Sequence, residues 1–222
     1  MINTETTKKL EEKSVENTAK RPDEQSGIYV RGHIKIFDPE TKEVFIDKPN
    51  AIHYENMSIA LAQSLSNSGQ GTIYQMAFGN GGTTIDPTGI ITYLTPNSTG
   101  SNASLYYETY SKVVDDRSVT NLDPIRNKIE TRHVTGTNYT DVFVTCLLDY
   151  GEPSGQEAFD NTTDNGSSFV FDELGLRAYS SSGTGRLLTH VIFHPVQKSL
   201  NRLIQIDYTV RIQSLTGLNE VA

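Results

Sequence analysis

Apolar and polar side chains alternate with a period of two through most of residues 28–222. The clearest run is 203–213, LIQIDYTVRIQ, whose apolar side is formed by Ile204, Ile206, Tyr208, Val210 and Ile212. The run 28–37, IYVRGHIKIF, repeats the pattern with Arg31, His33 and Lys35 on its polar side. Successive side chains of a strand point to opposite faces, so these runs predict strands with one buried and one solvated face.

Several further segments are typical of strands. In 127–134, NKIETRHV, the polar face is Lys128, Glu130 and Arg132. Residues 105–114 and 186–195 complete the set. Two more buried faces are predicted from alternating apolar positions, one formed by Tyr74, Met76 and Phe78 and the other by Val142, Val144, Cys146 and Leu148.

One stretch has helical spacing instead. Between Pro49 and Gly69 the apolar positions are Met57, Ala60, Leu61 and Leu65. This predicts one helix near 55–66 that is capped by Asn50 or Asn56 and closed by SNSG at 66–69. A hairpin with the turn DPETKE (38–43) precedes it.

The pattern predicts a mainly β fold: an antiparallel, jelly-roll-like β-sandwich of one domain, 28–222, with one short helix. Long polar loops are expected at 79–104, 115–126 and 150–167. Residues 1–27 have no aromatic side chain, and six acids there face five bases. Such a segment buries too little apolar surface to offset its ordering entropy, so it is expected to be a flexible N-terminal arm. The alternative is an arm that becomes ordered on a neighbouring subunit through a short helix over 6–19.

Charge and composition narrow the classes of partner. The net charge is −8 and the pI is near 5.1, which disfavours binding to the phosphate backbone of nucleic acids. The single cysteine, Cys146, lies at an apolar strand position and is expected to be a buried, inert thiol. No secretory h-region and no run of 18 apolar residues is present, so we expect a soluble protein folded in a cytoplasm, with no membrane partner.

The segment 167–179, SSFVFDELGLRAY, places Asp172 and Glu173 inside an apolar run. Phe169 and Phe171 share a face, whereas Leu174, Leu176 and Ala178 share one that is shifted by one residue. A phase change beside Gly175 favours a β-bulge whose acids accept hydrogen bonds from backbone amides. The alternative is that the two acids form half of an active site, which requires a second acid or a base directed at the same point.

Other candidate chemistry is weaker. His190 and His194 are four residues apart, but on a strand that spacing is about 13 Å, too far for one metal ion, so both are interpreted as polar-face residues. The segment DNTTDNGSS (160–168) has the composition of a calcium loop but fails the EF-hand register. The glycines of 79–82 open no phosphate-binding motif and are interpreted as positive-φ residues. The sequons at Asn97, Asn102 and Asn161 and the many serines carry no specific signal, so no catalytic residue, cofactor or metal site is predicted.

Four segments resemble virion proteins of tailed bacteriophages. They are FDELGLRAY (171–179), RLLTHVIFHPVQKSLNRLIQIDYTVRIQ (186–213), NAIHYENMSIALAQSL (50–65) and IYQMAFGNGGT (73–83). The resemblance implies a non-enzymatic β-sandwich building block of the neck, tail, baseplate or capsid exterior. Its partners would be its own copies and other virion proteins, and it would be assembled in the host cytoplasm. The alternatives are a capsid-exterior decoration protein, an enzyme, and a host-saccharide receptor-binding module that uses Tyr93, Tyr106, Tyr107, Tyr110 and Tyr139.

Overall fold

The computed structural model describes residues 27–100, 103–155 and 169–215. In chain order the elements are β1 (Gly27–Phe37), β2 (Val44–Ile52), α2 (Tyr54–Leu65), β3 (Ile73–Gly79), β4 (Thr83–Ile85), β5 (Ile91–Tyr93), β6 (Glu108–Val113), β7 (Lys128–His133), β8 (Tyr139–Leu148), β9 (Val170–Ala178), β10 (Thr189–Gln197) and β11 (Ile204–Leu215). Nearly all of the predicted arm, residues 1–26, lies outside the described residues, as does the calcium-loop candidate at 160–168. No helix in the described ranges is long and apolar enough to cross a membrane.

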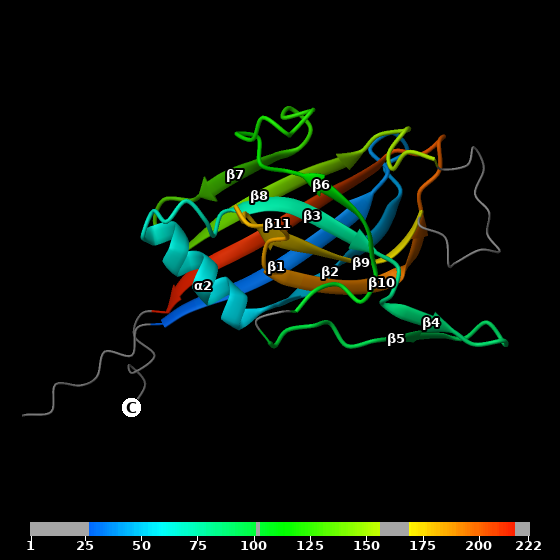
Figure 1. Cartoon of the computed structure of the whole chain (residues 1–222), viewed down its shortest axis with the longest axis horizontal. Coiled ribbons are helices and arrows are strands. Elements are labelled where there is room, and N and C mark those ends of the chain that lie inside the picture. Colours follow the sequence, from blue (N-terminus) through cyan, green and yellow to red (C-terminus); the bar gives the residue numbers. More distant parts are fainter. Residues whose placement is uncertain (1–26, 101–102, 156–168, 216–222) are drawn as a thin grey trace, which may run out of the picture.

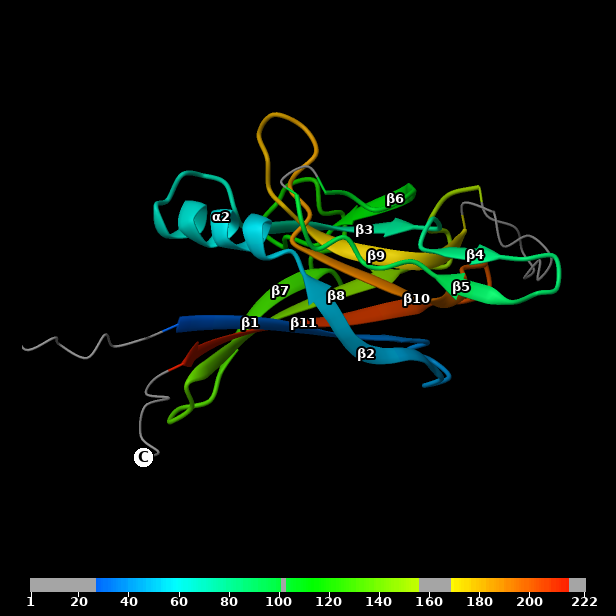
Figure 2. The same ribbon diagram turned by 90° about the horizontal axis from the view of Figure 1, so that it is seen from below.

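Nine strands form one antiparallel sheet in the order β6-β3-β9-β10-β2-β1-β11-β8-β7. The sheet curls into two facing layers, and Figure 2 shows β2 passing from one layer to the other. β2 pairs with β1 through residues 44–50 and with β10 through Ala51 and Ile52. The predicted mainly β, sandwich-like fold with one helix is therefore confirmed (Figure 1).

The core lies between the two layers and is built from the predicted alternating positions. Fully buried members include Ile34, Met76, Leu174, Val144 and Tyr208. Cys146 is a free, fully buried thiol, and its burial raises its pKa to about 12. The predicted burial of the cysteine is confirmed, and the raised pKa disfavours the thiolate, which is the reactive form.

Helix α2 begins one residue before the predicted start, and its cap is neither predicted asparagine. His53 is the N-cap, and its Nδ1 accepts a hydrogen bond from the Asn56 backbone at 3.2 Å. The Asn56 side chain is buried and donates to the Leu187 carbonyl at 2.9 Å. Asn56 therefore ties the helix to the chain before β10 instead of capping it.

The predicted buried set of β3 is wrong at Tyr74. Pairing between β3 and β9 shifts register between Ile73 and Gln75, which changes the phase of the strand there. Ile73 consequently packs on the core, whereas Tyr74 is only half-buried and stacks edge-on against Tyr179 at 5.2 Å.

Candidate functional site

A group of three buried ionisable side chains lies on the neighbouring strands β9 and β10. Asp172 is 3% exposed, and Glu173 and His190 are fully buried. The backbone beside them is irregular: residues 193–195 of β10 stand opposite Asp172 alone. In a regular strand, residues three apart point to opposite faces, yet Phe171 and Leu174 both belong to the main core. The predicted break at Asp172 is thus confirmed, but the longer insertion lies on β10.

The Glu173 carboxylate is saturated with hydrogen-bond donors. Its Oε1 accepts from the backbone amides of Tyr107 at 2.8 Å and Gly81 at 3.2 Å. Its Oε2 accepts from the Tyr106 amide at 2.9 Å and from His190 Nε2 at 2.9 Å. Burial acts to raise the pKa of Glu173, but the donors His190, Tyr107 and Tyr106 outweigh it, and the pKa is lowered.

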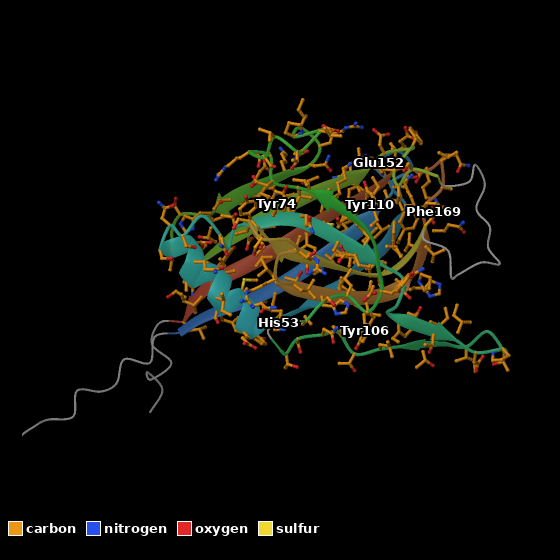
Figure 3. The ribbon with its side chains drawn as sticks, viewed as in Figure 1. His53, Tyr74, Tyr106, Tyr110, Glu152 and Phe169 are labelled. Atoms are coloured by element: carbon orange, nitrogen blue, oxygen red, sulfur yellow. The ribbon has the colours of Figure 1, made fainter. Side chains whose placement is uncertain are left out.

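The hydrogen bonds of His190 define its tautomer. Its Nδ1 lies 2.7 Å from the backbone nitrogen of Asn97, which can only donate, so Nδ1 is the acceptor. The ring proton is therefore on Nε2, where it is donated to Glu173. Tyr106, labelled in Figure 3, packs its ring 5.7 Å from the His190 ring. His190 is neutral in this arrangement, since a second ring proton would point at the Asn97 amide.

Asp172 binds the backbone at the start of the connection 80–107, just after β3. Its Oδ1 accepts from the Gly82 amide at 2.9 Å, and its Oδ2 accepts from the amide of Thr83 at 2.8 Å and from the Thr83 hydroxyl. Burial raises the pKa of Asp172 despite these bonds, and the neighbouring charge of Glu173 adds to the increase.

Together the three side chains fasten the connection 80–107, which includes the β4–β5 hairpin, onto β9 and β10. We call Asp172, Glu173 and His190 the loop clamp. They accept hydrogen bonds from backbone amides at six positions, 81, 82, 83, 97, 106 and 107, and also from the hydroxyl of residue 83. The structure thus supplies the base that a catalytic role needs, but the oxygens and ring nitrogens already have partners. Clefts of about 720, 460 and 240 Å³ elsewhere in the described chain are lined by other residues.

The glycines of 79–82 serve this clamp, and the expectation of positive φ for them is wrong. None of Gly79, Gly81 and Gly82 has a positive φ. A Cβ on Gly79 would lie 2.6 Å from Glu173 Oε1, and one on Gly82 would lie 3.1 Å from Glu173 Cβ. The nearest atom to a Cβ on Gly79 is the Tyr107 carbonyl oxygen at 2.4 Å, and a Cβ on Gly81 would meet only atoms of Tyr106 and Tyr107, at 2.7–2.8 Å. Glycine is therefore favoured at 79 and 81 because residues 106 and 107 pass close by, whereas at 82 the contacts are tight but not prohibitive.

The remaining sequence candidates are dispersed. The interpretation of His190 as a polar-face residue is wrong, since the connection 80–107 covers that face. His194 is exposed, and its Nδ1 lies 3.3 Å from the Tyr93 hydroxyl. Tyr110 is half-buried, with its ring 6.0 Å from Phe78, and Tyr139 lies under the Arg211 guanidinium at 3.8 Å. Within the described ranges no group of three or more His, Cys, Asp and Glu residues is placed to hold a metal ion.

A second feature is the connection from β6 to β7, which presents large apolar side chains to solvent. Val119 and Leu122 are each 96% exposed, and Ile125 is 82% exposed. We call these three residues the apolar loop patch. The three lie within seven residues of the chain, and exposed apolar side chains that gather mark interaction sites more often than isolated ones do.

The backbone that carries the patch is held by its own polar residues. Asn121 donates to the carbonyls of Asp115 at 3.2 Å and Asn127 at 2.9 Å. Arg126 forms ion pairs with Asp123 and, at 2.7 Å, with Asp149. The patch is therefore displayed on a fixed connection.

The chain has no match among protein-family models, curated proteins or solved structures. The resemblance of its segments to tailed-phage virion proteins therefore stays a prediction. The structural features that bear on function are a loop fastened by buried carboxylates and an apolar patch on a fixed connection.

Proposed function

We propose that the protein is a non-enzymatic structural component of a tailed-bacteriophage virion. In this proposal it assembles as a homo-oligomer, a ring or an appendage on the neck, tail or baseplate, through its loops and N-terminal arm. The resemblance of 50–65, 73–83, 171–179 and 186–213 supports the virion assignment. The apolar loop patch is the observation that carries the assembly role.

The physical argument concerns the cost of association. Val119, Leu122 and Ile125 remain in water although a fixed backbone holds them, so their burial in a neighbour would release apolar surface from solvent. Because Asn121 and Arg126 already order the connection, little conformational entropy is lost on docking. In a closed ring, each copy presents this patch to a different surface of the next copy.

The loop clamp supports the same assignment. Its carboxylates and imidazole are buried and bound to backbone amides, which leaves them to position the connection 80–107 and not a substrate. That connection displays further apolar surface, including Ile90 at 63% exposure and Tyr107 at 64%. A rigidly fastened loop with exposed apolar side chains suits a contact between copies.

The test is the mass of the full-length protein in solution, measured by sedimentation velocity from about 1 to 100 µM, together with its detection in purified particles. A defined multimer, and labelling at one position on the particle, are expected. A monomer at every concentration that is also absent from particles would overturn the proposal.

A second candidate is a host-saccharide receptor-binding module. Two of the predicted tyrosines favour it: Tyr93 and Tyr107 are 50% and 64% exposed on the connection 80–107. Sugar rings stack on such side chains. Saturable adsorption of the isolated protein to host cells, lost in Y93A/Y107A, would favour this function, and its absence would leave assembly as the role of the loop.

A further inference from the structure

Strand β1 has an open edge over its first half. All of Gly27–Phe37 pairs with β11 on one side. On the other side, pairing with β2 covers only Gly32–Phe37, because β2 leaves β1 at Asn50 to join β10. Residues 27–31 therefore have backbone groups directed at no strand of the described chain. Such an edge is a template for another extended segment.

The space beside this edge is a cleft of about 720 Å³. Tyr29 and Arg31 of β1 line one side, and Ala51 and Tyr54 line the other. Ile28, on the core-facing side of β1, is 68% exposed, and Tyr54 is 61% exposed. The edge is thus both open and flanked by uncovered apolar side chains.

A row of charges ends at the same edge. Across four strands, Arg132 of β7 stands opposite Asp141 of β8, Asp141 opposite Arg211 of β11, and Arg211 opposite Arg31 of β1. Asp141 binds Arg211 through two hydrogen bonds of 2.6 and 2.7 Å, and Arg132 donates to Glu130 at 2.8 Å. Among the described residues, no hydrogen bond or ion pair is formed by the Arg31 side chain. The next strand in the row would therefore be expected to supply an acid.

We propose that the open edge of β1 is the seat of the N-terminal arm of a second copy, which adds as an antiparallel strand and places Asp23 against Arg31. This inference rests on the proposed homo-oligomer and names one further contact between its copies, beside the apolar loop patch. Backbone hydrogen bonds would supply affinity, and the ion pair would set the register.

The residues that would face Arg31 differ between the chain's own arm and the arm of a second copy, so charge distinguishes the two possible occupants. If the arm folded back through a two-residue turn at Gln25 and Ser26, Lys20 would stand opposite Arg31, and like charges directly opposite destabilise a sheet. In a two-fold arrangement centred on Gly27, Asp23 of one copy stands opposite Arg31 of the other. Charge therefore favours exchange between copies.

Pro22 fits the same arrangement. In the two-fold register it stands opposite Gly32, the first residue at which β2 occupies the edge of β1. Proline has no amide proton to donate and is tolerated at strand ends. The added strand would thus end where the open edge ends.

The test uses full-length chains with single cysteines. One chain carries Asp23→Cys, a second chain of different tag mass carries Arg31→Cys, and the mixture is oxidised and run on a non-reducing gel. Cys146 stays in place because it is buried. A disulfide-linked heterodimer is expected, at least tenfold more abundant than with the control Lys35→Cys, which lies on the same strand and face where β2 covers the edge.

Two outcomes would overturn the inference. In the double variant K20C/R31C, an intramolecular disulfide without heterodimers in the mixture would assign the edge to the chain's own arm. No disulfide in any combination would show that the edge is not the seat. Both leave the proposed function standing if sedimentation still finds a multimer, whereas a monomer that forms no cross-links and is absent from particles removes the inference and the proposed function together.

Discussion

His190 donates its Nε2 proton to Glu173 across 2.9 Å while its Nδ1 accepts from the backbone of Asn97. One neutral imidazole thus joins the Glu173 carboxylate to the backbone of Asn97, which precedes His190 by 93 residues in the sequence. The relationship makes Glu173 the centre of the loop clamp, since its two oxygens bind four donors.

The first prediction concerns the charge on Glu173. Replacement by Gln removes the anion and directs an NH₂ group at an N–H donor, so E173Q is expected to lower the free energy of unfolding by about 2–3 kcal/mol. Urea denaturation of the wild type and E173Q measures this difference in the free energy of unfolding. The control E130Q changes a half-buried glutamate that pairs only within β7 and should have a much smaller effect. Equal effects of the two variants would contradict the clamp.

A second prediction concerns acid. The pKa of Glu173 is lowered, so its stabilising contribution is complete above the ordinary value of 4.5 and is lost as the pH falls through the folded value. The stability gap between the wild type and E173Q should therefore narrow below pH 4.5. The pKa of Asp172 is raised, so the gap between the wild type and D172N should instead widen as the pH falls toward 3.8. Urea titrations from pH 7 to 3.5 compare the two trends.

The third prediction tests the close approach of the connection to the acids. A Cβ on Gly79 would press on Glu173 Oε1, so G79A is expected to destabilise the fold by about 1–3 kcal/mol. G151A is the matched control, because nothing lies within 4 Å of a Cβ there and its φ is not positive. Thermal unfolding of both variants measures the difference in stability. If G79A is as stable as the wild type, the connection can shift away from the added Cβ.

Strand positions were accessible from sequence because the core side of each strand is apolar. In β11 and β8 the alternation predicts both the strand and its buried face, and Tyr208 and Val144 are fully buried. The pattern assumes that polar positions meet water. That assumption fails on β10, where His190 is polar and buried because a segment remote in sequence covers it.

The clamp itself was beyond sequence reasoning for the same reason. The phase change at Asp172 and Glu173 indicated an irregular strand, but the donors come from residues 81–107, and no local signal connects those amides to β9. Likewise the cap of α2 is His53, a residue with weaker capping preference than the asparagines nearby, because Asn56 is engaged by Leu187. Tertiary contacts decide these cases.

A fourth prediction follows from Lys198, which is buried and donates to the carbonyls of Ser199 at 2.9 Å and Tyr150 at 3.3 Å. Burial lowers its pKa to about 8, and the charges of Glu152 and Asp149 only partly offset this. Between pH 8 and the ordinary value of 10.5 the unfolded chain binds more protons, so stability rises with pH. Across this window the free energy of unfolding of the wild type should rise by about 1–3 kcal/mol relative to that of K198M, as measured by urea denaturation at each pH. Parallel pH profiles would contradict the shift.

The last prediction tests the apolar loop patch. Because Val119, Leu122 and Ile125 are 82–96% exposed, V119S/L122S/I125S should leave the unfolding temperature of the separated subunit nearly unchanged. If the patch packs on a neighbouring copy, the same variant should weaken self-association at least tenfold in sedimentation equilibrium. L65S is the matched control, since Leu65 is 87% exposed on α2, outside the connection from β6 to β7. Unchanged association in the triple variant, with the control equally unaffected, would place the contacts between copies elsewhere, on the connection 80–107 or the open edge of β1.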